Sequence, residues 1–212
     1  KIRVFEKLNS SYELFVDDLF GIQKDNWTFK ALGTISKINK QSLKGSCDPD
    51  YLFKYLDIAG IVEPKVIGEL QEMKFKDAPS RARRITTDIS IIISMVRPYH
   101  KSFAYLENSK DIIASTGTAV IEVDKIHDSK FIFHQFFAKR FMKYCEDRMT
   151  GTNYPAITPK DIEQFEVSLP NNKQNEIEVS EKLNSIESNI NIIKSLISSS
   201  QSLQKSLINQ VF

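Results

Sequence analysis

The sequence predicts an α+β fold, in which a domain with a substantial mixed sheet precedes one long, coiled-coil-type α-helix. Short apolar runs separated by turn signals fill residues 27–170, and a heptad pattern without glycine or proline fills residues 171–212. The 212 residues, of which 41% are hydrophobic and 26% charged, can bury one core. We therefore expect a helical lead-in at 1–20, a central domain at 21–170 and a long helix at 171–212.

Several classes of protein are excluded by the same composition. The longest uncharged apolar run, residues 89–96, is far shorter than the ~20 residues that cross a bilayer. No basic and apolar leader opens the chain, and the two cysteines, Cys47 and Cys145, form neither a disulfide framework nor a zinc ligand set. The expectation is a protein of the reducing cytoplasm without a membrane partner.

The elements follow from local patterns. Apolar residues three and four apart predict a helix over 1–20, which Gly21 ends. Strands are predicted at 51–58, 89–96, 112–114 and 119–123, the second of them buried on both faces. One helix is expected at 130–148. A shorter helix should begin with Thr158 as N-cap and Pro159 as first residue, and a strand follows at 165–169.

The last segment carries a heptad seam. Its apolar residues step by three and four, and the predicted helix-pairing residues are Leu183, Ile186, Ile190, Ile193, Ile197, Leu207 and Val211. A helix of ~40 residues would extend ~60 Å, too long to pack wholly on one domain of this size. We expect another helix as its partner; the alternative is a helix folded back on its own domain.

Positive charge is concentrated in one stretch of the chain. Between Lys74 and Lys101 there are seven cationic and two anionic residues, a local charge of +5 in a chain whose net charge is +2. Such a patch favours docking to a polyanion, and the competing interpretation is a solvated face.

No catalytic set can be assembled from the sequence. The stretch 48–51 resembles an adenine-methyltransferase motif, but no glycine-rich turn precedes it to hold S-adenosylmethionine. Residues 49–50 with 63–65 spell a metal-nuclease pattern, which Pro64 interrupts. The three histidines lack zinc-ligand spacing, and His134 is interpreted as structural. We expect a binding protein with no metal and no catalytic residues.

Three segments together carry a family resemblance. They are PSRARR at 79–84 with SMVRPY at 94–99, then ASTGTAV at 114–120, then GTNYPAI at 151–157. In that order, and before a long helix, they resemble the target-recognition domain and conserved-type helix of a type I restriction–modification specificity (S) subunit. Thr87 stands where the family usually has a glycine. Family members usually carry two such domains and two such helices, so the chain resembles a half-length subunit or a fragment.

The resemblance implies a non-catalytic, sequence-specific DNA-binding subunit of a restriction–methylation enzyme. It would recognise one half of a split target in double-stranded DNA and dock the DNA adenine methyltransferase and motor-endonuclease subunits. S-adenosylmethionine, ATP and Mg would then be bound only by those partners. A half-length subunit would form a homodimer or pair with a second specificity half.

The expected DNA-binding residues divide by chemistry. Lys and Arg hold phosphates, whereas Arg, Asn and Thr read base edges. The basic candidates are Lys74, Lys76, Arg81, Arg83, Arg84, His100 and Lys101, and the polar loop candidates are Thr150, Thr152, Asn153 and Tyr154. Arg97 is instead predicted to make ion-pair or backbone bonds. The alternatives are a specificity subunit of another restriction–methylation type, a coiled-coil interaction protein without DNA binding, and a metal-dependent nuclease.

Overall fold

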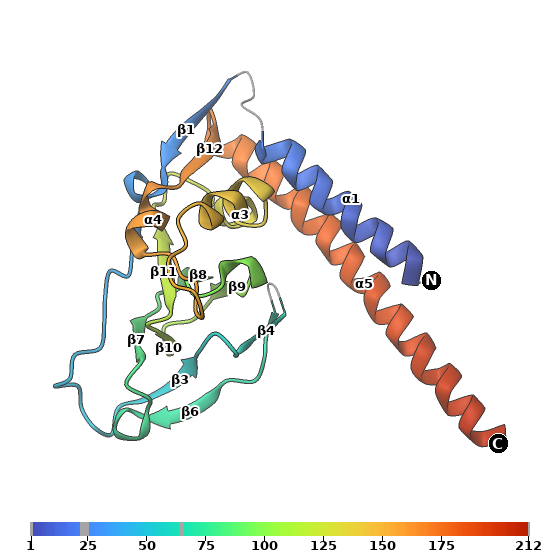
Figure 1. The fold of residues 1–212 in the computed structure, drawn as a ribbon, viewed down its shortest axis with the longest axis horizontal. Helices are drawn as coiled ribbons and strands as arrows, with labels where there is room; N and C mark the ends of the chain where they lie inside the picture. The colour runs from blue at the N-terminus through green and yellow to red at the C-terminus, as the bar shows by residue number, and fades with distance from the viewer. Residues whose placement is uncertain (1, 22–25, 64–65, 212) are drawn as a thin grey trace.

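The structure, a computed structural model, describes residues 2–21, 26–63 and 66–211 of the chain. A body of strands and short helices carries two long helices, α1 (Ile2–Gly21) and α5 (Lys173–Val211), which run side by side in opposite directions (Figure 1). The predicted α+β class with a mixed sheet and a long C-terminal helix is confirmed. The first helix ends at Gly21, as its sequence pattern predicts.

Within the described residues the strands form two four-stranded sheets and two two-stranded ones. The first large sheet has the order β2-β11-β8-β9 and consists of β2 (Ser36–Ile38), β8 (Ile89–Ser94), β9 (Phe103–Glu107) and β11 (Thr118–Val123). The second has the order β6-β3-β10-β7 and consists of β3 (Leu52–Leu56), β6 (Gln71–Lys74), β7 (Ala82–Ile85) and β10 (Ile112–Ser115). Of the sheets in the described residues, the second alone is mixed, because β3 and β10 pair in parallel.

Shorter elements complete the body. One small sheet pairs β1 (Trp27–Ala31) with β12 (Glu166–Pro170), and the other pairs β4 (Ile61–Glu63) with β5 (Val66–Ile67). Single 3₁₀ turns are η1 (Leu32–Thr34), η2 (Phe75–Asp77) and η3 (Pro98–His100).

The strand β8 lies between two hydrophobic cores. Ile91 and Ile93 belong to the main core beside the helices, whereas Ile92 points the other way, into a second core with Leu56 and Val120. Alternate residues of a strand face opposite sides of a sheet, so a strand covered on both sides needs an unbroken apolar run. The prediction of a strand buried on both faces is confirmed.

The prediction of a single helix over residues 130–148 is wrong. The structure has two helices there, α2 (Ser129–Gln135) and α3 (Lys139–Glu146), separated where Ala138 adopts an extended conformation. On one continuous helix, Phe136 and Phe141 would lie about 140° apart around the axis. The break brings their ring centroids to 4.9 Å, and Phe141 in turn packs on Phe165. Burial of the aromatic cluster thus overrides helical periodicity.

The helix α4 (Pro159–Gln164) begins as its sequence predicts. The Thr158 side chain accepts a hydrogen bond from the backbone N–H of Asp161, and the Asp161 carboxylate accepts one from the backbone N–H of Thr158. This capping box satisfies donors that no helical carbonyl reaches.

Replacing Thr158 by Ala should lower the free energy of unfolding by about 1 kcal/mol, the usual contribution of a capping hydroxyl. Urea denaturation measures this loss. Thr158→Ser keeps the hydroxyl and is the matched control, which should stay close to the wild-type value. Equal losses in the two variants would show that the hydroxyl is not what stabilises the helix start.

The first half of α5 packs against the rest of the chain. Leu183 is fully buried in the main core, to which α1 contributes Val16 and Phe20. The buried carboxylate of Glu176 accepts a hydrogen bond from the backbone N–H of Asp128 and lies 2.7 Å from Nδ1 of His127. These contacts fix the direction in which α5 leaves the body.

A second set of polar contacts holds α5 about eight residues further along, through His134. His134 of α2 places Nε2 3.0 Å from Oδ1 of Asn184 and Nδ1 3.3 Å from the hydroxyl of Tyr12, which also bonds to Glu187. His134 is therefore structural, as the sequence predicts, and joins α1, α2 and α5 at one point.

The predicted pairing seam is covered only along part of its length. Leu183 and Ile190 are buried by the chain itself, and Ile193 and Ile197 are half-buried. Ile186 and Leu207 are exposed, and the side chain of Val211 lies outside the described residues. The first half of the seam thus faces the chain's own α1 and α2, which is the fold-back alternative, while the second half lacks a cover within the described chain.

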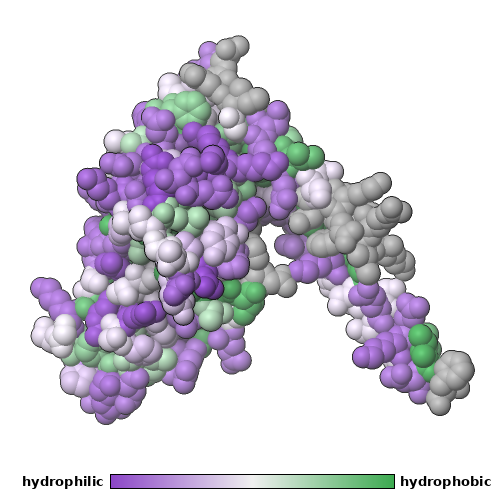
Figure 2. Space-filling view, in the orientation of Figure 1, coloured by the Kyte–Doolittle hydropathy of each residue, from purple (hydrophilic) through white to green (hydrophobic). Residues whose placement is uncertain are grey.

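The second half of α5 stands clear of the body, with hydrophobic side chains near its tip (Figures 1 and 2). A helix of 39 residues is ~58 Å long. Large exposed apolar residues along it are Ile192, Leu196, Leu203, Leu207 and Ile208. Among the described residues, no helix is both long and apolar enough to cross a membrane.

Candidate nucleic-acid interface

The basic residues 81–84 lie at the edge strand of the mixed sheet. Ala82 of β7 points into a small core with Phe53 and Ile113, which anchors the strand. The backbone carbonyl of Arg81 accepts a hydrogen bond of 2.8 Å from Thr116, in the turn between β10 and β11. The outer edge of β7 is covered by residues 41–43, because Leu43 donates a backbone hydrogen bond to the carbonyl of Arg83 and Ile85 donates one to the carbonyl of Gln41.

A line of backbone hydrogen bonds joins this strand to the polar loop 150–156. The carbonyl of Gly117, next to Thr116, accepts from Met95 at 3.0 Å, and the Met95 carbonyl accepts from Ile157 at 3.0 Å. Two predicted segments that lie about seventy residues apart in sequence are therefore linked through this series of backbone hydrogen bonds. We call this the recognition edge; it comprises residues 81–84, the turn 115–118, residues 95–97 and the loop 150–156.

The loop residues are well placed to touch a ligand. Thr150, Thr152, Asn153 and Tyr154 are all exposed. Arg97 donates a hydrogen bond from Nη2 to the backbone carbonyl of Asn153 at 2.8 Å, so the sequence prediction of a backbone-bonding Arg97 is confirmed. The amide of Asn153 and the hydroxyl of Thr152 present donors and acceptors of the kind that read base edges.

The three arginines of β7 differ in their surroundings. Arg81 is exposed, whereas Arg83 stacks its guanidinium 4.9 Å from the ring centroid of Phe75 and donates to the carbonyl of Ala82. Arg84 is half-buried, and its Nε is buried without a hydrogen-bond partner. A buried guanidinium nitrogen without a partner is costly unless a ligand or water supplies one. Arg81 and Arg84 are thus the more available of the three for an anion.

Lys74 and Lys76, two of the predicted basic DNA-binding residues, share one carboxylate partner. Lys74 and Lys76 each place Nζ 3.0 Å from the same oxygen of Asp50. Their hydrogen bonds lower the pKa of the Asp50 carboxyl below its ordinary value. All three side chains are exposed, so the pair adds one net positive charge to the surface beside the sheet.

His100 and Lys101 lie on the side of the body that faces α1. Nζ of Lys101 is 3.8 Å from a carboxylate oxygen of Glu13, and the His100 ring lies 4.7 Å from that of Tyr99. Both residues follow Arg97 closely along η3. They extend the recognition edge toward the helices and do not join the β7 arginines.

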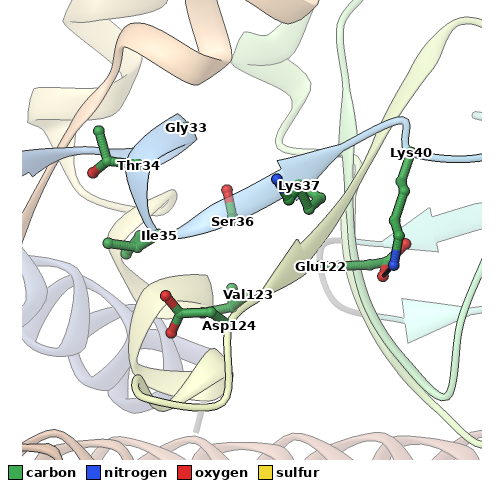
Figure 3. Close-up of a pocket in the computed structure, with 9 residues that line it drawn as sticks. All are labelled: Gly33, Thr34, Ile35, Ser36, Lys37, Lys40, Glu122, Val123 and Asp124. Atoms are coloured by element: carbon green, nitrogen blue, oxygen red, sulfur yellow. Dashed lines mark hydrogen bonds and ion pairs between the residues drawn. The ribbon is translucent and has the colours of Figure 1, made fainter.

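A shallow hollow elsewhere on the surface has a different character. It encloses about 270 Å³ beside β2 and the end of β11 (Figure 3). Lys40 and Glu122 point toward one another across it at 3.4 Å, and Asp124 accepts from the backbone N–H groups of Ile126 and His127. Lys40, Glu122 and Asp124 thus already have partners within the chain.

Several side chains of the kinds that take part in catalysis have structural contacts in the described residues. Cys145 is buried, and burial raises the pKa of its thiol to about 12. His127 and His134 hold α5, as described above. Among the described residues, no group of three or more His, Cys, Asp or Glu side chains could hold a metal ion. Of the nuclease pattern, Pro64 and Lys65 lie outside the described residues, and Asp50 is paired with lysines.

Comparison with known proteins identifies the fold. No family model and no curated protein matches the sequence. A chain from a study of complex assembly and conformational transition of the type I R-M system shares 25% identity and a TM-score of 0.74, over 90% of this chain and 50% of that one. The HsdS subunit from Thermoanaerobacter tengcongensis shares 24% and 0.72, over 87% and 48%.

A more distant structure has the same architecture. The S subunit of the type I restriction-modification system from M. genitalium shares 15% identity and a TM-score of 0.53, over 85% of this chain and 44% of that one. The chain thus spans about half the length of the solved structures that it matches. Its fold is that of the recognition domain and long helix found in type I specificity subunits.

Proposed function

We propose that this chain is a sequence-specific DNA-binding specificity subunit of a type I restriction–modification enzyme, which recognises one half of a split target. The observation that carries the proposal is the recognition edge. It combines the arginines of β7 with the exposed polar loop 150–156, in a body whose fold is shared with specificity subunits. Cations beside base-reading side chains are the combination that duplex recognition requires.

The two parts of the edge would act differently. Arg81 and Arg84 would hold phosphates, which sets the orientation of the chain on the duplex without reading its sequence. Asn153 would read a base edge, since its amide can pair bidentately with adenine in the major groove. One arginine of β7 reading guanine would extend the readout to a second base.

Chemistry would be supplied by partner subunits. We infer that the chain is not an enzyme and that a DNA adenine methyltransferase subunit and a motor-endonuclease subunit bind S-adenosylmethionine, ATP and Mg. The burial of Cys145 and the structural contacts of His127 and His134 support a purely recognising role. The α1–α5 pair offers a rigid docking element for such partners.

The exposed half of α5 would pair with a second copy of this chain. Its apolar residues Leu203 and Leu207 are 66% and 61% exposed. Apolar surface in contact with water is unfavourable, and a partner helix that covers these residues removes that cost. Two copies related by a two-fold axis would place two recognition edges on two half-sites. The direction in which α5 leaves the body would then set the spacing between those half-sites.

DNA binding is tested by the dependence of affinity on salt. Changing Arg81 and Arg84 together to Ala should weaken duplex binding and lower the slope of log K against log salt by about 0.9 for each phosphate that the variant no longer holds. Fluorescence anisotropy with a random-sequence duplex pool measures both quantities for the wild-type chain and the variant.

The matched control for this experiment is Lys110→Ala. Lys110 is an exposed cation that lies outside the recognition edge as defined above, and its charge is already balanced by Asp88 at 3.6 Å. Its removal should leave the slope unchanged. If the double arginine variant also keeps the wild-type slope, the assignment of the edge to DNA is wrong.

A second candidate function rests on the exposed stripe of α5. A helix-pairing interaction protein without a DNA role would also show Leu203 and Leu207 at its surface. Association of the wild-type chain without binding to any duplex, at any salt concentration, would favour this candidate.

A further inference from the structure

The loop 150–156 is closed and tightly held, although its tip is exposed. Thr150 and Ala156 exchange two backbone hydrogen bonds of 3.0 Å, and Ala156 also pairs with Val96. Gly151 adopts φ +94°, and a Cβ there would lie 3.2 Å from the carbonyl oxygen of Tyr154. Such a conformation and such a close approach favour glycine, so the tip is confined to a narrow range of shapes.

Arg97 is the residue that fixes the tip to the body. It is itself in the left-handed region at φ 48°, ψ 56°, which is costly for a residue other than glycine. Its backbone N–H donates to the carbonyl of Pro155 at 2.8 Å, and its Nη2 donates to that of Asn153 at 2.8 Å. Arg97, whose backbone is strained, thus donates two hydrogen bonds to the loop.

The same guanidinium also supports an aromatic ring. The Arg97 Cζ lies 5.1 Å from the ring centroid of Tyr154, within the range of a cation–π contact. Yet Tyr154 is 73% exposed. A ring that buries so little area adds little to the free energy of folding. The stability of the fold therefore does not explain why Arg97 holds this ring in place.

Another tyrosine stacked by arginine shows the contrast. Arg148 lies 3.7 Å from the ring centroid of Tyr144, but that ring packs on Phe165 and its hydroxyl donates to the carbonyl of Asp161. Tyr144 is thus tied into the body, whereas Tyr154 is presented outward. An aromatic face that is both rigid and exposed suits stacking on another flat ring.

We propose that Arg97 is a positioning residue that holds the ring of Tyr154 ready to stack on a base at a deformed step of the duplex. This inference rests on the proposed function, because it needs DNA at the recognition edge. It assigns Tyr154 to stacking, not to hydrogen-bond reading, and leaves Asn153 and Thr152 to meet the base edges. Strain at Arg97 would be retained because it fixes the loop before DNA arrives.

The test uses the full chain and a duplex that this chain has enriched from a random-sequence pool. Tyr154→Ala should weaken binding to that duplex by about 5-fold to 100-fold, the range that one stacked base contributes. The salt slope should not change, because the substitution removes no charge. Tyr154→Phe keeps the ring and should retain wild-type affinity. If the Phe variant binds as weakly as the Ala variant, the hydroxyl is what matters and the stacking role is wrong.

The role of Arg97 is tested with Arg97→Gly, which tolerates the left-handed backbone and removes only the side chain. It should weaken binding as Tyr154→Ala does, and the double variant should be no weaker than either single one, because both remove the same stacking interaction. Arg97→Lys should not restore affinity, since an ammonium cannot stack as a planar guanidinium does.

Other results separate the possible failures. A drop of about 0.9 in the salt slope of Arg97→Gly would make Arg97 a phosphate contact and overturn its positioning role. Additive losses in the double variant would do the same. If Arg97→Gly does not fold, the comparison of Tyr154→Ala with Tyr154→Phe still decides the stacking role, because Tyr154 is exposed. If the wild-type chain enriches no duplex, the proposed function itself fails.

Discussion

Leu183→Asp should lower the free energy of unfolding by more than about 4 kcal/mol and leave little folded chain. Leu183 is 0% exposed, in the core where α5 meets the residues of α1 and α2. Removing a buried leucine side chain typically costs about 2–5 kcal/mol, and an unpaired buried carboxylate adds the cost of its desolvation. Denaturation followed by the fluorescence of Trp27, the single tryptophan, measures the loss. Trp27 packs against Phe131 of α2 and so reports on this region.

Leu203→Asp is the matched control for that experiment. It introduces the same charge on the same helix at a residue that is 66% exposed. At a concentration low enough to keep the chain monomeric, its effect should stay within about 0.5 kcal/mol, as for most surface substitutions. Similar losses at the two positions would mean that the first half of α5 does not pack on the body.

Changing Leu203 and Leu207 together to Asp should convert a dimer into a monomer without unfolding it. Both residues are exposed on the free half of α5, where two helices would have to bring these positions together. Two carboxylates in an apolar interface between helices are strongly unfavourable, because each would be buried without a partner. Sedimentation velocity over a range of concentrations measures the association.

Ser198→Asp controls for charge alone, since it lies on the opposite face of α5 at 100° per residue and is exposed. It should associate as the wild type does. A dimer that survives the Leu203 and Leu207 changes would place the interface elsewhere, and a wild-type chain that is monomeric at every concentration would remove the pairing proposal. Ile190, which the heptad pattern also singles out, is 8% exposed and would report on folding instead.

Local patterns predicted the elements that short-range interactions govern. The unbroken isoleucine run of β8 indicated a strand covered on both faces, and Thr158-Pro159 marked the start of α4. The absence of glycine and proline after residue 170 indicated one long helix, which the structure has as α5. In each case the residues that decide the element are neighbours in sequence.

Patterns misled where the core made a competing demand. The phenylalanines of 130–148 suit one helix, but Phe136 and Phe141 pack on Phe165 only if the helix breaks. The heptad seam likewise indicates that α5 needs an apolar partner. Periodicity alone does not distinguish a partner in the same chain, such as α1, from a helix of another molecule. Leu183 and Leu207 carry the same pattern and have opposite surroundings.

By itself, the sequence determined the fold class, the long helix, the basic stretch and the polar loop as separate features. Only the tertiary structure decided how they are connected: backbone hydrogen bonds from Arg81 through Thr116, Gly117 and Met95 to Ile157 link the segments of the recognition edge. It also decided that Arg83 is stacked while Arg84 has a buried nitrogen without a partner, and that Arg97 holds Tyr154. The reason is physical. Helix periodicity and capping act over a few residues, whereas strand pairing between distant segments depends on the whole core.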